Sequence, residues 1–306
     1  MRHLLSMADL KPAEIEKIFA ISEDLKSKYE AGLREPILPG RVLALIFEKP
    51  SLRTRVSFES AMINLGGNSL FLGDDTGWGA NRESLADFGR VLSQYVDVLV
   101  VRSHDHKTVE ELRNYCTRPV INGLTDYEHP CQVLADLYTL KECVGRLRGH
   151  TLAYVGDGNN VARSLALGCG KLGVKFHMAT PSGYRFDAAF EKLLRDDVPD
   201  LEITVTDDPA EAVAEATAIY TDVWTSMGQE QETAQRKRDF AAYQINEALL
   251  AKAPAGAYFM HCLPAHRGEE VTSAVIDGPQ SIVVQQAGNR MHVQKGILAW
   301  LLSRAG

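Results

Sequence analysis

Short apolar runs alternate along this chain with longer segments in which apolar residues recur at helical spacing. The runs are continuous and end at polar residues, which is the pattern of a strand buried on both faces of a sheet. Because helical segments separate successive runs, we expect crossover connections and parallel sheets. The predicted strands are 42–47, 69–72, 98–101, 119–122, 151–155, 175–179, 201–205, 218–221, 258–261 and 281–284.

The length of the chain predicts two domains. A chain of 306 residues is long for a single hydrophobic core and short for three. A long helix that opens near His129 and runs to about Val144 is the predicted linker, and we place the boundary within it, between residues 138 and 139. The expected fold class is therefore α/β, with two doubly wound domains, each a parallel β-sheet flanked by helices.

Composition narrows the range of partners and compartments. The net charge of −7 disfavours nucleic acid, because its phosphates would be repelled overall. No apolar stretch approaches the roughly 18 residues that span a bilayer, and the start of the chain is too short and polar for a signal peptide. The chain has 5 cysteines, an odd number without Cys-x-x-Cys spacing, which favours reduced thiols. We expect a cytoplasmic protein that binds neither membrane nor nucleic acid.

An anion site is predicted where the first strand gives way to a helix. Pro50 ends the strand, and Ser51 suits the N-cap of the helix that follows. Unpaired backbone N–H groups and the helix dipole favour negative charge at such a start, and Arg53 and Thr54 add a guanidinium and a hydroxyl. The segment predicts a phosphate site. The alternative is a solvated basic helix start.

Polar residues recur at the carboxyl ends of the predicted strands. Arg102, Asp157, Asp222 and Cys262 each come at the end of an apolar run or shortly after it. In open parallel sheets the ligand crevice lies outside the carboxyl ends of the strands. We therefore expect these side chains to converge on one cleft.

The linker helix opens with His129-Pro130-Cys131-Gln132, in which Pro130 suits the first helical position. His129 can donate a hydrogen bond to an oxygen that gains charge, and Gln132 offers both an amide donor and an acceptor. A structural role for the His-Pro pair is the commoner alternative.

A dinucleotide site is a weaker interpretation. Gly156 and Gly158 follow a strand and precede a helix, but Val161 occupies the third glycine position of the dinucleotide-binding motif. Asn159 and Asn160 at the helix start favour capping, or capping together with contact to a small polar ligand.

Two later segments also carry chemistry. Asp222 precedes a hydrophilic loop that contains Gly228. A carboxylate at this position suits an ammonium group, and loops of this kind commonly close over a substrate. A capping Asp on a surface loop is the alternative.

The segment with His261, Cys262 and His266 suggests two hypotheses, a metal site and a catalytic thiol. No second Cys/His cluster occurs to complete a metal site, and the papain-type signature of a catalytic thiol is absent. We expect no metal ion.

These motifs resemble those of the aspartate/ornithine carbamoyltransferase family. The matching segments are Ser51-Leu52-Arg53-Thr54-Arg55, His129-Pro130-Cys131-Gln132, Asp222-x-x-x-Ser226-Met227-Gly228 and His261-Cys262-Leu263-Pro264, followed by similarity through 289–295. The last two motifs are typical of the ornithine branch and are lacking in the aspartate branch. The resemblance implies a transferase that moves the carbamoyl group of carbamoyl phosphate to the δ-amine of ornithine, giving citrulline and phosphate. It also implies a homotrimer with its active site in the interdomain cleft and no cofactor.

The resemblance implies a role for each part of the chain. Residues 1–138 would bind carbamoyl phosphate, with a C-terminal helix of about 290–306 packed back on them, and residues 139–289 would bind ornithine. Three residues, Arg102, His129 and Cys262, would be catalytic, with Cys262 orienting ornithine rather than attacking it. The residues implied around carbamoyl phosphate are Ser51, Leu52, Arg53, Thr54, Trp78, Arg102, His129, Pro130, Cys131, Gln132, Cys262, Leu263 and Arg290. Those implied around ornithine are Asn160, Asp222, Ser226 and Met227.

One position departs from the family pattern. Trp78 stands where the ornithine branch usually presents Gln or His to the phosphate site of the neighbouring subunit, and acetylornithine carbamoyltransferases carry Trp there. The alternatives left open are carbamoyl transfer to N-acetylornithine or putrescine and, from another class, a Rossmann-like nucleotide-dependent oxidoreductase or binding protein. The Ser226-Met227-Gly228 loop favours ornithine.

Overall fold

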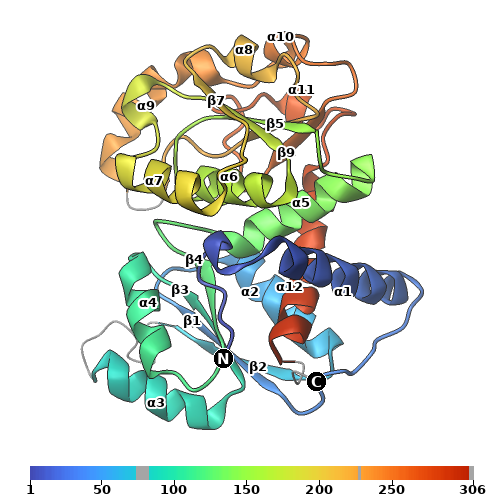
Figure 1. The fold of residues 1–306 in the computed structure, drawn as a ribbon, viewed down its shortest axis with the longest axis vertical. Helices are drawn as coiled ribbons and strands as arrows, with labels where there is room; N and C mark the ends of the chain where they lie inside the picture. Colours follow the sequence, from blue (N-terminus) through green and yellow to red (C-terminus); the bar gives the residue numbers. More distant parts are fainter. Residues whose placement is uncertain (74–82, 227–228, 303–306) are drawn as a thin grey trace. The chain divides into compact units, whose positions relative to one another are not determined.

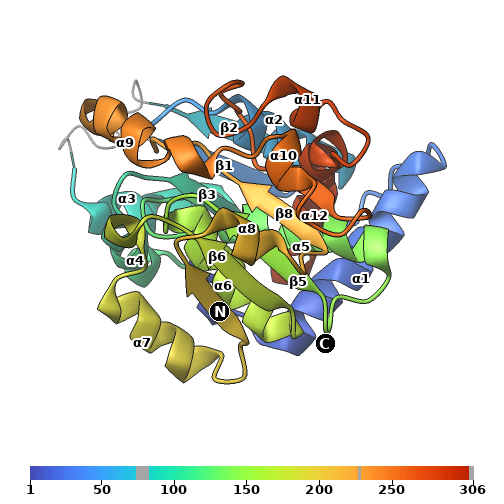
Figure 2. The same ribbon diagram turned by 90° about the horizontal axis from the view of Figure 1, so that it is seen from above.

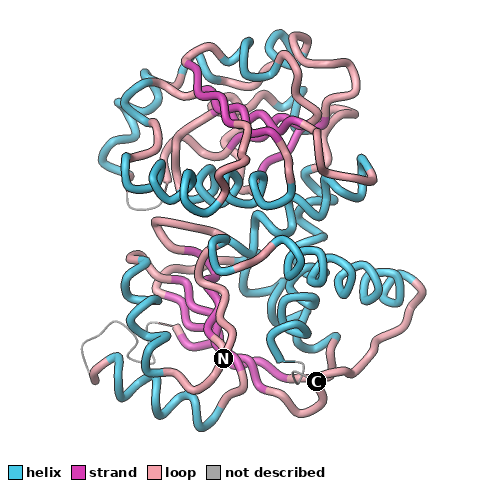
Figure 3. The backbone as a smooth tube through the Cα atoms, in the orientation of Figure 1, coloured by secondary structure: helices cyan, strands magenta, loops and turns pink. Residues whose placement is uncertain are grey.

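The computed structural model describes residues 1–73, 83–226 and 229–302. It divides the chain into two compact units, one made of Met1–Ala135 with Asn289–Gly306 and the other of Asp136–Gly288. Each unit contains one sheet of strands (Figure 3). The divisions fall inside helices α5 (Pro130–Val144) and α12 (Val283–Leu302). Trp78 and Met227 lie outside the described residues.

The first unit is built on a four-stranded parallel sheet in the order β2-β1-β3-β4. Helices α3 and α4 cover one face, and α1, α2 and the end of α12 lie on the other (Figure 1). Side chains of β1 and β3 alternate between the faces, so Ile46 and Val101 pack with α4 residues such as Leu112. The elements are η1 (Met7–Asp9), α1 (Pro12–Glu30), β1 (Val42–Phe47), α2 (Leu52–Asn64), β2 (Asn68–Leu72), α3 (Leu85–Tyr95), β3 (Val98–Arg102), α4 (His106–Tyr115) and β4 (Val120–Leu124).

The second unit is built on a five-stranded parallel sheet in the order β7-β6-β5-β8-β9. Helices α6 and α7 lie on one side of it and α8, α10 and α11 on the other (Figure 2). Its elements are β5 (Thr151–Val155), α6 (Asn160–Leu172), β6 (Lys175–Ala179), η3 (Ser182–Tyr184), α7 (Ala188–Asp197), β7 (Ile203–Thr206), α8 (Pro209–Val213), β8 (Ala218–Thr221), η4 (Glu230–Glu232), α9 (Thr233–Asp239), η5 (Ala241–Tyr243), α10 (Glu247–Leu250), β9 (Tyr258–His261) and α11 (Ser273–Ile276).

Strand order places one switch point in each sheet. In the first unit the connections run outward in opposite directions from β1 and β3, and in the second from β5 and β8. Ligands of open α/β sheets bind outside the carboxyl ends of the strands at such points. Arg102 ends β3, and Asp222 directly follows β8. The topology therefore supports a ligand site in each unit.

One predicted strand is wrong. Residues 281–284 do not form a strand, because Ser281 makes only an isolated bridge to Phe259 and α12 begins at Val283. The helix also starts earlier than the predicted position of about 290. A short apolar run does not distinguish a buried strand from the first turn of a buried helix, and most of α12 is buried on all sides. The other predicted strands are present, with shifts of their ends.

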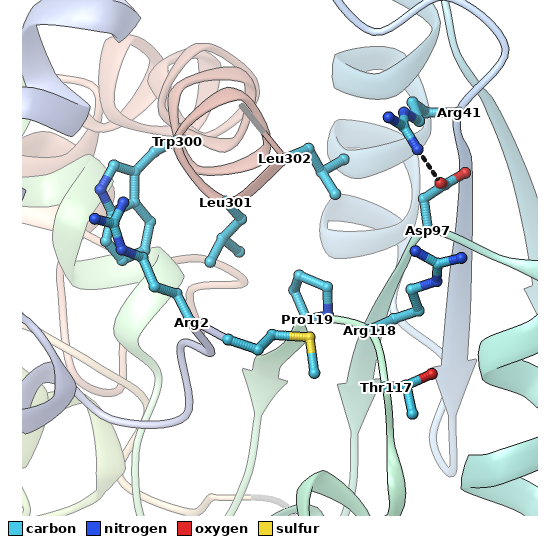
Figure 4. Close-up of a pocket in the computed structure, with 10 residues that line it drawn as sticks. Arg2, Arg41, Asp97, Thr117, Arg118, Pro119, Trp300, Leu301 and Leu302 are labelled. Carbon is cyan, nitrogen blue, oxygen red and sulfur yellow. Dashed lines mark hydrogen bonds and ion pairs between the residues drawn. The ribbon is translucent and has the colours of Figure 1, made fainter. Parts of the chain in front are cut away.

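A separate pocket of about 490 Å³ lies in the first unit, near the residues that precede β1, β3 and β4 (Figure 4). On one side of it Arg41 pairs with Asp97 at 2.6 Å. On the other the Arg2 guanidinium lies 5.2 Å from the ring centre of Trp300, close to the end of α12. Basic side chains are favoured at the negative end of a helix dipole. None of the described residues predicted to bind substrate lines this pocket.

Candidate active site

The start of α2 is the centre of the predicted site residues of the first unit, called the first half below. Ser51 is the N-cap residue, and its hydroxyl accepts the N–H of Thr54 at 3.3 Å. The hydroxyl of Thr54 in turn accepts a 2.8 Å hydrogen bond from the Arg290 guanidinium of α12. Both side chains are buried. The fold thus brings Arg290 to the helix start predicted to hold an anion.

Arg102 lies beside this helix start. It ends β3 directly opposite Phe47 of β1, and its carbonyl accepts the N–H of Glu48 at 2.9 Å. Burial, and then the positive charges of Arg290 and Arg53, lower the pKa of Arg102 to about 10. The three guanidiniums therefore repel one another in a partly dehydrated place. Such an arrangement favours a bound anion, which relieves the repulsion.

His129 opens α5 and is held by the loop before it. Asn122 of β4 donates to the carbonyl of Glu128 at 3.2 Å, and the Glu128 carboxylate accepts the N–H of Met7 at 2.9 Å. Burial, followed by the charges of Arg290 and Arg102, puts the pKa of His129 well below its usual value. Its imidazole is therefore neutral at physiological pH, and a neutral imidazole has one N–H to donate.

Two other predicted residues of this half need a more specific description. The side chain of Leu52 is 75% exposed, so any ligand contact there is assigned to the backbone N–H of the first helical turn. The thiol of Cys131 donates to the carbonyl of Asn122 at 3.5 Å, and burial raises its pKa to about 12. Cys131 is therefore a neutral thiol that ties α5 to β4. Gln132 is buried in the first turn of α5.

Asp222 is the centre of the predicted site residues of the second unit, called the second half below. One carboxylate oxygen accepts the N–H of Val223 at 2.8 Å and the thiol of Cys262 at 3.0 Å. The other accepts the side-chain amide of Asn159 at 2.9 Å. Burial, and then the charge of Asp222, raise the pKa of Cys262 well above its usual value. Cys262 is therefore a neutral hydrogen-bond donor, which supports an orienting role over nucleophilic attack.

Asn159 is the functional residue that the predicted set lacked. Its side-chain oxygen caps α6 by accepting the N–H groups of Val161 and Ala162, both at 3.0 Å. That leaves its NH₂ group for Asp222. Asn160, the residue predicted to bind ornithine, is the first residue of α6 and accepts the N–H of Val161. The N-cap rule could have identified Asn159 from the sequence. An amide side chain that caps a helix with its oxygen still has an NH₂ group that can donate to a neighbouring strand.

Asp157 follows β5 but has a structural partner. It forms a 2.6 Å ion pair with Arg236 of α9, whose guanidinium also donates to the carbonyl of Trp224 at 3.1 Å. Arg236 thereby anchors the segment after Asp222, within which the N–H of Ser226 donates to the Gln229 side chain at 3.0 Å. Asp157 serves the loop rather than a ligand.

Metal binding does not fit the cluster of Asp222, His261 and Cys262, although their ligand atoms lie within 4.8 Å of one another. The Nδ1 atom of His261 accepts the N–H of Leu263, and its Nε2 atom faces the Glu270 carboxylate at 3.2 Å. Both ring nitrogens are thus used in hydrogen bonds, and Cys262 holds its proton.

Comparisons with known proteins agree with this geometry. The chain matches the models "Aspartate/ornithine carbamoyltransferase, carbamoyl-P binding domain" over residues 2–142 and "Asp/Orn binding domain" over residues 148–301. It is 50% identical to ornithine carbamoyltransferase of Anoxybacillus flavithermus, over 98% of this chain and 96% of the relative. The solved ornithine carbamoyltransferase of Pyrococcus furiosus matches with a TM-score of 0.96 and 46% identity, covering 100% of this chain and 98% of that one. The Thermus thermophilus enzyme matches with a TM-score of 0.89 and 41% identity, covering 99% of each chain. The chain therefore belongs to the aspartate/ornithine carbamoyltransferase family.

Proposed function

We propose that this protein transfers the carbamoyl group from carbamoyl phosphate to the δ-amine of L-ornithine, giving L-citrulline and phosphate. The observation that carries the proposal is the group of three guanidiniums, Arg53, Arg102 and Arg290, gathered around the start of α2 with the hydroxyl of Thr54 among them. A doubly charged phosphate beside a polarisable carbonyl matches this set of donors.

The second half supports ornithine as the acceptor. Asp222 is oriented by Asn159 and Cys262, and its carboxylate suits the α-ammonium of an amino acid. It would repel the side-chain carboxylate of aspartate. The relatives named above carry the name ornithine carbamoyltransferase.

The reaction follows from these groups. The neutral δ-amine attacks the carbonyl carbon, a C–N bond forms and the bond to the phosphate oxygen breaks. The amine loses one proton, which the departing phosphate takes up. Negative charge develops on the carbonyl oxygen, where Arg102, the neutral imidazole of His129 and Thr54 supply hydrogen bonds worth about 3 kcal/mol each. Gln132 and the Leu263 carbonyl hold the carbamoyl amine, and Arg290 completes this subsite. Ser51 and Arg53 hold the departing phosphate. Fixing both substrates adds about 7 kcal/mol or more.

The domain assignment is part of the proposal. Residues 1–138 bind carbamoyl phosphate and residues 139–289 bind ornithine, which the two family-model matches support. The remaining residues of α12 belong with the first part, because Arg290 donates to Thr54.

A homotrimer is also proposed. The described part of the first unit carries exposed apolar side chains on one stripe of α2, namely Leu52, Val56 and Ile63, and on the edge strand β2, at Leu70. Apolar residues on an unpaired sheet edge and its neighbouring helix need a partner surface. A second copy of the chain supplies it, and Trp78 then reaches the phosphate site of the neighbouring subunit.

We place the reaction in arginine biosynthesis, because a relative from Pyrococcus furiosus at 47% identity is named anabolic. The compartment proposed is the cytoplasm, which the five free cysteines support. Within the described residues, no helix meets the length and hydropathy needed to cross a membrane.

N-acetylornithine is the second candidate acceptor, favoured by the tryptophan at position 78. Acetylation removes the α-ammonium that Asp222 would bind, so the second half of the site disfavours it. The test measures the carbamoylated product and the phosphate formed from carbamoyl phosphate with ornithine, N-acetylornithine, putrescine and aspartate in parallel. Turnover with ornithine well above the other three supports the proposal. Preference for any other acceptor overturns it.

A further inference from the structure

The loop that follows β9 is kept in an uncommon backbone conformation. Leu263 has a φ of +58°, in the left-handed region that residues other than glycine, asparagine and aspartate seldom adopt. The backbone N–H of His261, at the end of β9, donates to the Gln286 side chain at 3.0 Å and fixes where the loop begins. Further contacts are needed to hold Leu263 itself.

The side chain of His261 supplies that contact. Its Nδ1 atom accepts the backbone N–H of Leu263 at 2.9 Å. A backbone N–H can only donate, so Nδ1 carries no proton. The ring of His261 is therefore neutral, with its proton on Nε2.

Glu270 selects this tautomer. One of its carboxylate oxygens lies 3.2 Å from Nε2 of His261 and also accepts the backbone N–H of His266. The side chains of His261 and Glu270 are both 0% exposed. A carboxylate can only accept, so Nε2 must be the donor. The opposite tautomer would set an N–H against the N–H of Leu263 and a lone pair against the carboxylate.

We propose that Glu270 and His261 are positioning residues for carbamoyl transfer. Neither contacts a substrate. Together they fix the Leu263 carbonyl, which receives the carbamoyl amine, and they steady Cys262, whose thiol donates to Asp222 at 3.0 Å. This inference rests on the proposed function. It adds a carboxylate, Glu270, that acts through a histidine on the backbone of the site.

The first test observes the tautomer directly and needs no activity. Nitrogen NMR of the enzyme with ¹⁵N-labelled histidine, at neutral pH, should show His261 with its proton on Nε2. The His261→Asn variant identifies the signal by its loss. A proton on Nδ1, or on both nitrogens, overturns the proposal. If the wild type makes no citrulline, the proposed function fails while this result stands.

The second test separates the two hydrogen bonds of the ring. The Asn side chain of His261→Asn can place its oxygen near the position of Nδ1, so it keeps the acceptor for Leu263. The Gln side chain of His261→Gln reaches towards Nε2 and keeps the donor for Glu270, but it loses that acceptor. We expect His261→Gln to lose about 100-fold in kcat/KM for carbamoyl phosphate, the cost of a small misplacement at the site. The His261→Asn variant should stay within about tenfold of wild type.

Equal losses in the two variants, both folded by circular dichroism, would overturn the role of the Leu263 contact. A rise in the KM for ornithine as large as the rise in the KM for carbamoyl phosphate would overturn that role as well. If the buried carboxylate destabilises His261→Asn, the double variant with Glu270→Gln removes that charge. Its activity should then match or exceed that of His261→Gln, and a lower activity would also contradict the proposal.

Discussion

The two halves, which are the predicted site residues of the first and of the second unit, are stabilised in opposite ways. In the first unit, like charges gather around Thr54, and the pKa of Arg102 falls to about 10 because burial and neighbouring cations oppose its charge. In the second unit, the one carboxylate at the centre, Asp222, has hydrogen-bond donors from Val223, Asn159 and Cys262. A bound anion would therefore relieve repulsion in the first half, whereas the carboxylate of the second half has hydrogen-bond donors from the protein itself. The difference predicts opposite responses of stability to removal of the central charge.

The largest expected effect comes from Arg102→Met. Loss of a donor to the developing oxyanion should lower kcat by about 100- to 1,000-fold. The same change should raise the melting temperature of the ligand-free protein. Burial and the neighbouring cations, which lower the pKa of Arg102 to about 10, oppose its charged form by an energy on the order of 3 kcal/mol. Differential scanning calorimetry and steady-state rates measure the two effects. A variant that is both inactive and less stable would contradict the account of mutual repulsion.

The second unit should respond in the opposite sense. Asp222→Asn removes the charge that pairs with the α-ammonium of ornithine and disturbs three hydrogen bonds. We expect a loss of about 10- to 100-fold in kcat/KM for ornithine, as for loss of a hydrogen bond to a charged group, together with a lower melting temperature. Asp239→Asn, at the half-buried end of α9, removes another carboxylate that accepts hydrogen bonds, from Tyr184 and Gln235, and serves as the matched control for activity. An unchanged melting temperature would show that the hydrogen bonds around Asp222 do not stabilise the folded protein.

We expect the activity to depend on the assembly of subunits, through residues of the first unit. Arg53→Ala and Trp78→Ala should each be impaired, the first through loss of a phosphate ligand and the second through loss of a contact supplied by a neighbouring subunit. Mixed trimers made by dissociating and reassociating equal amounts of the two inactive proteins should recover at most about a quarter of the activity, through sites built from intact residues of different chains. No recovery, with Trp78→Ala severely impaired on its own, would place Trp78 in the site of its own subunit.

The smallest effect concerns Cys262. Because burial and Asp222 raise its pKa, the thiol should react with iodoacetamide at pH 8 far more slowly than a free cysteine. Cys262→Ser keeps a donor to Asp222 and should retain activity within about tenfold of wild type. Loss of activity below one part in about a thousand would instead indicate covalent catalysis, as for a removed nucleophile.

The sequence predicted the first half better than the second, for a physical reason. Strand ends and helix starts are local, so Ser51, Arg53 and Arg102 could be placed from the pattern of apolar runs, and the predicted strands outside 281–284 are present. In the second half the working contacts join distant segments. Asn159 contacts Asp222 only because α6 and β8 meet at a switch point.

The ion pair of Asp157 with Arg236, and the hydrogen bond between Glu270 and His261, likewise depend on the fold. No spacing rule in a single sequence reveals such pairs. The strand predicted at 281–284 failed for a related reason. The short apolar run at the start of α12 has the same local composition as a buried strand, although Val284 is 85% exposed.

Isothermal titration calorimetry of wild type, Arg102→Met and Asp222→Asn tests the central claim most directly. Each protein is titrated first with carbamoyl phosphate. Binding of the amino acid is then measured with ornithine at a saturating level of phosphate. With saturating carbamoyl phosphate, the unreactive analogue norvaline replaces ornithine to prevent turnover. The account predicts that Arg102→Met loses affinity for carbamoyl phosphate by about tenfold or more while Asp222→Asn binds it like wild type. It also predicts that Asp222→Asn is the variant with impaired binding of the amino acid. Equal losses of both ligands in both variants would contradict a site divided into an anion half and an ammonium half.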